Sequence, residues 1–129
     1  RRFKTVQSDQ DAYLNSVAFG LQSFYSGVER ALELVAEEMD GGTLGGESWH
    51  AELLRQVATD VPGVRPPVLQ RGTEDWLDNY RKFRHRARNI YATNLVPDRV
   101  EPLVIGLATG WPLARNELIA FAEFLDGLG

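Results

Sequence analysis

Apolar residues recur every three or four positions along most of the chain, the spacing that places side chains on one face of an α-helix. The first series predicts a helix over residues 8–39. Its members are Tyr13, Val17, Leu21, Phe24, Val28, Leu32, Val35 and Met39. Ser8 and the acidic residues that follow it predict the start of this helix, because such side chains favour the first turn. Gly41 and Gly42 predict its end.

Two further helices are predicted between segments that cannot continue a regular helix. Residues 41–46 contain four glycines, so we expect a flexible connector there. A second helix is predicted over residues 48–59. Residues 60–72 contain three prolines, which exclude a regular helix. Thr73 is then the expected N-cap of a third helix that continues to about residue 93.

The remainder of the chain is also predicted to be helical. Pro97 suits the first position of a fourth helix. Gly110, Trp111 and Pro112 predict a break, and we expect a fifth helix from Pro112 onward. No strand-like alternation, internal repeat or low-complexity segment occurs. The pattern therefore predicts a single all-α domain over residues 1–129, an up-and-down bundle of four to five helices.

The third predicted helix combines a core-facing stripe with a polar edge. With about 100° of rotation per residue, one narrow arc contains Trp76, Tyr80, Phe83, Ala87 and Ile90. The edge between the buried and exposed faces carries Arg81, Arg84, His85, Arg88 and Tyr91. A guanidinium at such a boundary is partly desolvated and holds an anion more strongly than a fully hydrated one.

Composition excludes several classes of protein. The 129 residues are 43% hydrophobic and include three Trp, six Phe and four Tyr, which excludes a disordered chain. No apolar run approaches the roughly 20 residues that cross a bilayer, and the polar residues 5–11 do not resemble the apolar centre of a secretory signal. The absence of cysteine excludes disulfides and thiolate metal sites, and two histidines cannot build a His-rich metal centre. We expect a cytoplasmic protein without metal, cofactor or membrane contact.

The net charge of −4 hides an uneven distribution. Residues 81–88 hold five of the 14 basic side chains and no acidic one, which leaves 9 basic against 18 acidic side chains elsewhere. A basic patch on an acidic body indicates a specific surface rather than general stickiness, and the alternative is a solvated helix face. Arg84 and Arg88, one turn apart, repel each other unless an anion lies between them, and phosphate matches the planar guanidinium. The alternative is that Asp75, Asp78 or acids from other helices pair with these arginines.

One segment of the third predicted helix resembles a known family. Residues 83–91 read Phe-Arg-His-Arg-Ala-Arg-Asn-Ile-Tyr. The segment is similar to the motif Arg-polar-x-x-x-His-x-Tyr of the HEPN superfamily, and within it of the HepT-like toxin domains that accompany minimal nucleotidyltransferase (MNT) antitoxins. Further likeness lies in Tyr-Ser-Gly-Val-Glu-Arg at 25–30, Gly-Glu-Ser-Trp-His at 46–50, Leu53-Leu54 and Arg65-Pro66. The resemblance therefore extends from about residue 10 to residue 126.

The resemblance implies an HEPN-like bundle that forms a homodimer and cleaves RNA without a metal ion. The catalytic residues would be Arg84, His85 and Asn89, with Arg84 stabilising charge on the phosphorane. Arg81 and Arg88 would bind RNA phosphates. The resemblance also implies an MNT-type nucleotidyltransferase antitoxin as partner, which would transfer AMP to the motif tyrosine, Tyr91. The alternative for Tyr91 is a boundary aromatic whose hydroxyl reaches the surface.

Asn89 departs from the family motif, which has histidine at this position. Asparagine can hydrogen-bond a phosphate but cannot exchange a proton near neutral pH. Either His85 supplies the imidazole from the neighbouring ridge of the helix, or the protein has lost cleavage and has kept the binding of RNA, a nucleotidyltransferase or a nucleotide. His50, beside a tryptophan, is predicted to be a structural, hydrogen-bonded histidine.

Overall fold

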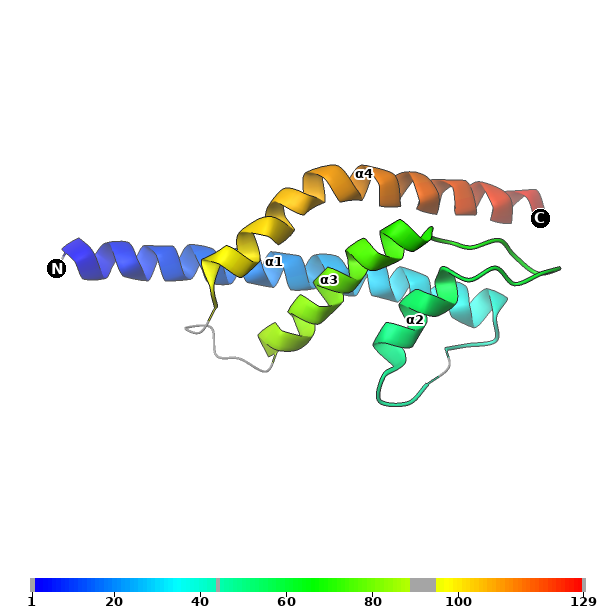
Figure 1. Ribbon diagram of the computed structural model, residues 1–129, viewed down its shortest axis with the longest axis horizontal. Helices are drawn as coiled ribbons and strands as arrows, with labels where there is room; N and C mark the ends of the chain where they lie inside the picture. The colour runs from blue at the N-terminus through cyan, green and yellow to red at the C-terminus, as the bar shows by residue number, and fades with distance from the viewer. Residues whose placement is uncertain (1, 44, 89–94, 129) are drawn as a thin grey trace.

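The computed structural model describes residues 2–43, 45–88 and 95–128. Within these ranges the chain forms four α-helices and no strand (Figure 1). They are α1 (Arg2–Met39), α2 (Trp49–Val57), α3 (Arg71–Arg88) and α4 (Pro97–Leu128). The predicted all-α bundle is confirmed, with the number of described helices at the lower end of the expected range.

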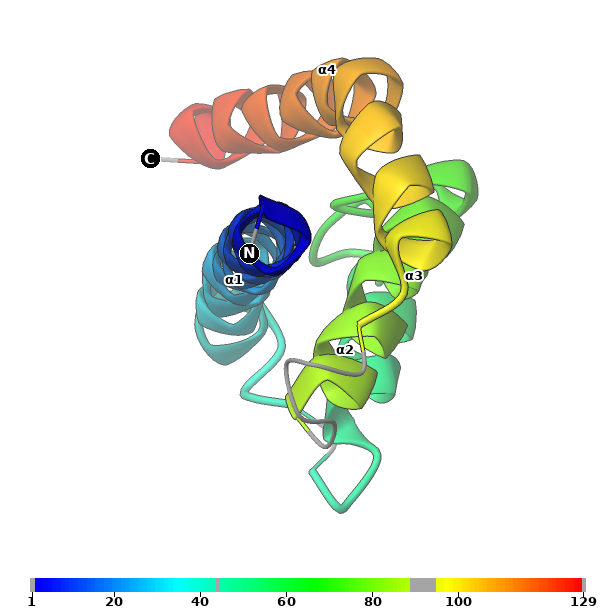
Figure 2. The same ribbon diagram turned by 90° about the vertical axis from the view of Figure 1, so that its left-hand side faces the viewer.

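Helix α1 is the longest element, and the other helices pack around it. Figure 1 shows that α4 begins beside the N-terminal half of α1 and continues in the same direction, whereas α3 runs the opposite way. In Figure 2, viewed nearly along α1, α4 lies on one side of α1 while α2 and α3 lie on another. Helix α3 packs against α1, α2 and α4, so its two flanks face different neighbours.

The hydrophobic core lies around the C-terminal half of α1, where α2, α3 and the loop before α3 meet. Helix α1 contributes Ala18, Leu21, Tyr25, Val28, Leu32 and Ala36. The same cluster includes Leu53, Leu54, Val57, Val68, Leu69, Leu77, Tyr80 and Phe83. Each fully buried leucine contributes about 1.5–3 kcal/mol of hydrophobic stabilisation. Tyr13, from the first predicted series, is 73% exposed, so the N-terminal part of α1 extends beyond this core.

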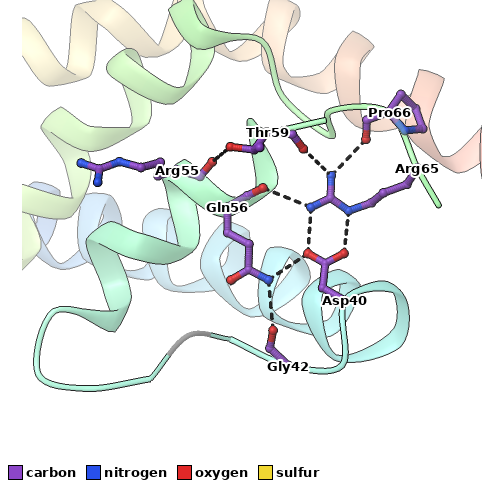
Figure 3. Close-up of polar contacts among 7 residues, drawn as sticks. All are labelled: Asp40, Gly42, Arg55, Gln56, Thr59, Arg65 and Pro66. Atoms are coloured by element: carbon purple, nitrogen blue, oxygen red, sulfur yellow. Dashed lines mark hydrogen bonds and ion pairs between the residues drawn. The ribbon is translucent and has the colours of Figure 1, made fainter. Parts of the chain in front are cut away.

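A buried arginine, Arg65, fastens the loop before α3 to α1 and α2 (Figure 3). Its Nε donates to Oδ1 of Asp40 at 2.8 Å and its Nη2 to Oδ2 at 2.7 Å. The remaining guanidinium hydrogens bond the backbone carbonyls of Gln56, Thr59 and Pro66. These hydrogen bonds from Arg65 outweigh the partial burial of Asp40 and lower the pKa of its carboxyl group. We call these five residues the Arg65 network.

Two predicted helix starts are wrong. Helix α1 begins at Arg2, so Ser8 lies inside it, because residues 2–7 contain no glycine or proline to stop an established helix from extending. Helix α3 begins at Arg71 rather than after Thr73, whose hydroxyl donates to Oε2 of Glu117 in α4 at 2.6 Å. The other oxygen of Glu117 accepts the backbone N–H of Gln70 at 2.6 Å. The Glu117 carboxylate of α4 thus accepts hydrogen bonds at the start of α3, where a neighbouring side chain would otherwise cap the helix.

The predicted break at residues 110–112 is also wrong, because α4 continues through Pro112 to Leu128. Pro112 offers no N–H to the preceding turn, and Figure 1 shows that the helix bends midway. Two glycines of α4 allow close packing. A Cβ atom on Gly110 would lie 2.0 Å from the Trp76 ring, and one on Gly106 would lie 3.1 Å from the Tyr80 hydroxyl. Their missing side chains let α3 approach α4.

Candidate functional site

A pocket of about 230 Å³ lies where the start of α2 faces the C-terminal half of α3. It is lined by Glu47, Ser48, His50, Ala51, Arg81, Arg84, His85 and Arg88. Four residues of the predicted polar edge therefore meet in one cavity. The pocket is smaller than the roughly 300–1,000 Å³ of sites that enclose a whole drug-sized ligand. Its size and its positive lining suit a phosphate group with part of its sugar.

The helical repeat of α3 places these side chains together. Arg81, Arg84 and Arg88 follow at intervals of three and four residues, so they lie on one face of the helix. The adjoining face is anchored in the core by Tyr80 and Phe83, which are buried as the stripe predicts. Trp76 and Ala87 pack against the same core, whereas Ile90 lies outside the described residues. Leu77, which the predicted stripe omits, is fully buried.

The basic cluster of residues 81–88 divides between two flanks of α3. Lys82 and Arg86 line a second pocket, on the side of α4, which also includes Arg99. They do not line the pocket that contains Arg84 and Arg88. The basic cluster therefore contributes to two separate surfaces. Of these two, the pocket with Arg84 and Arg88 is the one that also contains histidine.

The two explanations considered for the arginines each apply to part of the pocket. Arg81 is paired, because its Nε lies 2.6 Å from Oδ1 of Asp78, whose other oxygen lies 3.2 Å from Nζ of Lys82. Burial opposes ionisation of Asp78, but the hydrogen bonds from both cations prevail and lower its pKa. Within the described ranges, Arg84 and Arg88 form no ion pair with any acid. Arg84 is partly buried and Arg88 is exposed, so both positive charges point to a surface that an anion can reach.

His50 is held by a buried acid, which confirms its predicted hydrogen-bonded role. Its Nδ1 lies 2.8 Å from Oε2 of Glu29 in α1, and Glu29 is only 6% exposed. The ring of Trp49 covers the imidazole, with 3.8 Å between the two ring centres. Beside this pair, burial raises the pKa of the Tyr25 phenol, and the charge of Glu29 raises it further. Tyr25 therefore stays neutral at any physiological pH.

The sequence alone does not predict that His50 and Glu29 share a site with the arginines. Glu29 precedes His50 by 21 positions, and Arg81, the first residue of α3 that lines the pocket, follows His50 by 31 positions. No local spacing in the sequence therefore links these three residues. A signal was present, however. Both residues lie in short segments, 25–30 and 46–50, that carry the family resemblance. Segments outside the main motif of a family that still resemble it are candidates for residues that line the functional pocket.

Two residues of the predicted site, Asn89 and Tyr91, lie outside the described residues. Across residues 2–43, 45–88 and 95–128, no three His, Asp or Glu side chains come together in a way that could hold a metal ion. No helix in this described part of the chain has both the length and the apolar character needed to span a bilayer.

Comparison with known proteins identifies the family. The family described as HepT-like protein matches residues 16–125, which is most of the chain and includes every residue that lines the pocket. No curated protein and no solved structure matches. The chain belongs to the HepT-like family and is a HepT-like domain of the HEPN type.

Proposed function

We propose that this HepT-like domain is the toxin of a toxin–antitoxin pair and that it cleaves RNA without a metal ion or cofactor. The observation that carries the proposal is the pocket between α2 and α3. It joins three arginines and two histidines, and Arg84 and Arg88 have no acidic partner among the described residues. Such a site attracts a phosphodiester and provides imidazole groups beside it.

In the proposed reaction the 2′-oxygen of RNA attacks the adjacent phosphorus and the bond to the 5′-oxygen breaks. The products are a 2′,3′-cyclic phosphate and a 5′-hydroxyl. Arg84 stabilises the extra negative charge of the phosphorane, with Arg81 and Arg88 holding neighbouring phosphate oxygens. His85 is the acid–base group, and Asn89 orients the scissile phosphate by hydrogen bonds. We further propose that two copies of the chain form the RNA groove in the cytoplasm.

The partner in this proposal is an MNT-type nucleotidyltransferase that modifies Tyr91. The Tyr91 phenol oxygen would bond to the α-phosphorus of ATP, pyrophosphate would leave, and the phenol proton would pass to solvent. The added AMP would block the RNA groove. Mass spectrometry of the chain incubated with the nucleotidyltransferase and ATP tests this step, and Tyr91→Phe must abolish the added mass.

The test of the main proposal is incubation of purified protein with RNA in the presence of EDTA, followed by analysis of the RNA ends. We expect fragments with cyclic phosphate and 5′-hydroxyl ends. Arg84→Ala is expected to reduce the rate by about 10²–10³-fold, the usual cost of removing one donor to a developing oxyanion. Full activity of Arg84→Ala would refute the assignment.

A second function is favoured by one residue, Asn89, which replaces the histidine of the family motif. Under this alternative the domain is an inactive HEPN bundle that docks a nucleotidyltransferase or binds a nucleotide. His85→Ala discriminates between the two. It abolishes cleavage under the first proposal, whereas under the second there is no cleavage to lose and partner binding is unchanged.

A further inference from the structure

His50 has the arrangement of a histidine prepared to accept a proton. The Glu29 carboxylate can only accept a hydrogen bond, so Nδ1 of His50 is the donor across their 2.8 Å contact. In the neutral imidazole the lone pair then lies on Nε2. A carboxylate that fixes the tautomer and orientation of a histidine in this way is a general device for preparing a base.

The surroundings of His50 leave it accessible on one side. Glu29 is buried, and the Trp49 ring covers the imidazole. The His50 side chain nevertheless remains 33% exposed and lines the pocket. The charged groups that share this cavity are Glu47, Arg81, Arg84, His85 and Arg88.

Cleavage through a cyclic phosphate needs two proton transfers, one from the 2′-hydroxyl and one to the departing 5′-oxygen. One imidazole can carry out each of these proton transfers. His85 comes from α3 and His50 from α2, and both line the same pocket. Asn89 cannot provide either transfer.

We infer that His50 is a further catalytic residue, the general base of the proposed RNA cleavage, and that Glu29 is its positioning residue. The inference rests on the proposed function. Nε2 of His50 takes the proton of the 2′-hydroxyl while the 2′-oxygen forms its bond to phosphorus. The bond from phosphorus to the 5′-oxygen breaks, and that oxygen receives a proton from the His85 imidazolium. The proton on His50 then passes to solvent, and His85 takes up a proton from solvent.

The first variant is His50→Asn, because its amide nitrogen lies close to the position of Nδ1 and can still donate to Glu29 but cannot exchange a proton. We expect cleavage of a fluorescent single-stranded RNA of mixed sequence to fall at least about 100-fold. RNA affinity and the thermal unfolding temperature should stay close to those of the wild type. Arg55→Gln, on the exposed side of the same helix, is the matched control and should cleave normally.

The second variant is His50→Ala, assayed with and without free imidazole. Added imidazole should restore part of the cleavage of His50→Ala and should do nothing for Arg84→Ala, because a missing base can be replaced by a small base in solution. Glu29→Gln should reduce cleavage less than His50→Asn. These results would separate a proton-transfer role from a structural one.

The outcomes distinguish this inference from the proposal beneath it. Wild-type rates in His50→Asn, combined with loss of cleavage in Arg84→Ala, would overturn the role of His50 and leave the ribonuclease proposal standing. Failure of imidazole to rescue a folded His50→Ala would also overturn it. Undiminished cleavage by Arg84→Ala, or no cleavage by the wild type, would overturn both.

Discussion

Arg65, in the loop that follows α2, and Arg84, in α3 beside the start of α2, occupy opposite kinds of environment. Arg65 is fully buried, and all five of its N–H donors are used by one carboxylate and three backbone carbonyls. Arg84 is partly buried at the edge of a pocket and pairs with no acid among the described residues. The difference shows how to recognise a functional arginine. A satisfied guanidinium holds the fold together, whereas an unsatisfied one at a cavity is available for a ligand.

The largest expected effect on stability is that of Arg65→Ala. Removing one partner of a buried ion pair leaves the other charge uncompensated and costs about 3–5 kcal/mol of unfolding free energy. Urea unfolding followed by circular dichroism measures this cost. Arg84→Ala should cost less than about 1 kcal/mol, as should the exposed control Arg55→Ala. If Arg65→Ala and Arg84→Ala were equally stable, the contrast between the two arginines would be wrong.

A smaller loss of unfolding free energy is expected for Arg65→Lys, which keeps the positive charge but not the planar, forked set of guanidinium N–H donors. Lysine offers three donors on one nitrogen, so it cannot reach the carboxylate of Asp40 and all three carbonyls at once. Leaving buried acceptors unpaired costs about 1–3 kcal/mol. The same urea titration measures the loss. A fully stable Arg65→Lys would show that charge alone, without the fork geometry, maintains the loop.

Acid should weaken the Arg65 network by a still smaller amount. The pKa of Asp40 is lowered in the folded state, chiefly by the hydrogen bonds from Arg65. Its contribution is therefore complete above the unfolded aspartate pKa of about 3.9 and is lost as the pH falls through the lower folded value. Unfolding midpoints measured across this range should fall more steeply in the wild type than in Asp40→Asn. Because Asp78, whose pKa is also lowered, is present in both proteins, its contribution cancels in this comparison. Parallel curves of unfolding midpoint against pH would contradict the stabilising role of the Asp40 carboxylate.

The smallest effect concerns the salt dependence of RNA binding. Each phosphate contact to a single strand contributes about 0.7 to the slope of log affinity against log salt concentration. Arg88→Gln, in the pocket, should reduce the slope by about one contact, whereas Arg86→Gln, on the other flank of α3, should leave it unchanged. Fluorescence anisotropy titrations at several salt concentrations measure both slopes. An equal reduction of the slope in both variants would mean that RNA contacts the two flanks of α3 equally.

The sequence predicts the helices and the composition of the polar edge, because both follow from local periodicity. Arg81, Arg84, His85 and Arg88 share a face for the same reason that Tyr80 and Phe83 share the core. It does not predict features that depend on contacts between distant segments. The glycine at 110 is a helix breaker by local rules, but in the fold it makes room for Trp76. Likewise, the contact between His50 and Glu29 exists only once α1 and α2 have packed.

The most direct test of the account is RNA binding by Arg84→Ala measured beside Arg86→Ala. The two variants lose the same charge from the same helix and differ only in which flank they change. We expect Arg84→Ala to bind single-stranded RNA at least about tenfold more weakly, a loss of about 1.4 kcal/mol, and Arg86→Ala to bind it as the wild type does. Equal affinities in the two variants would contradict it.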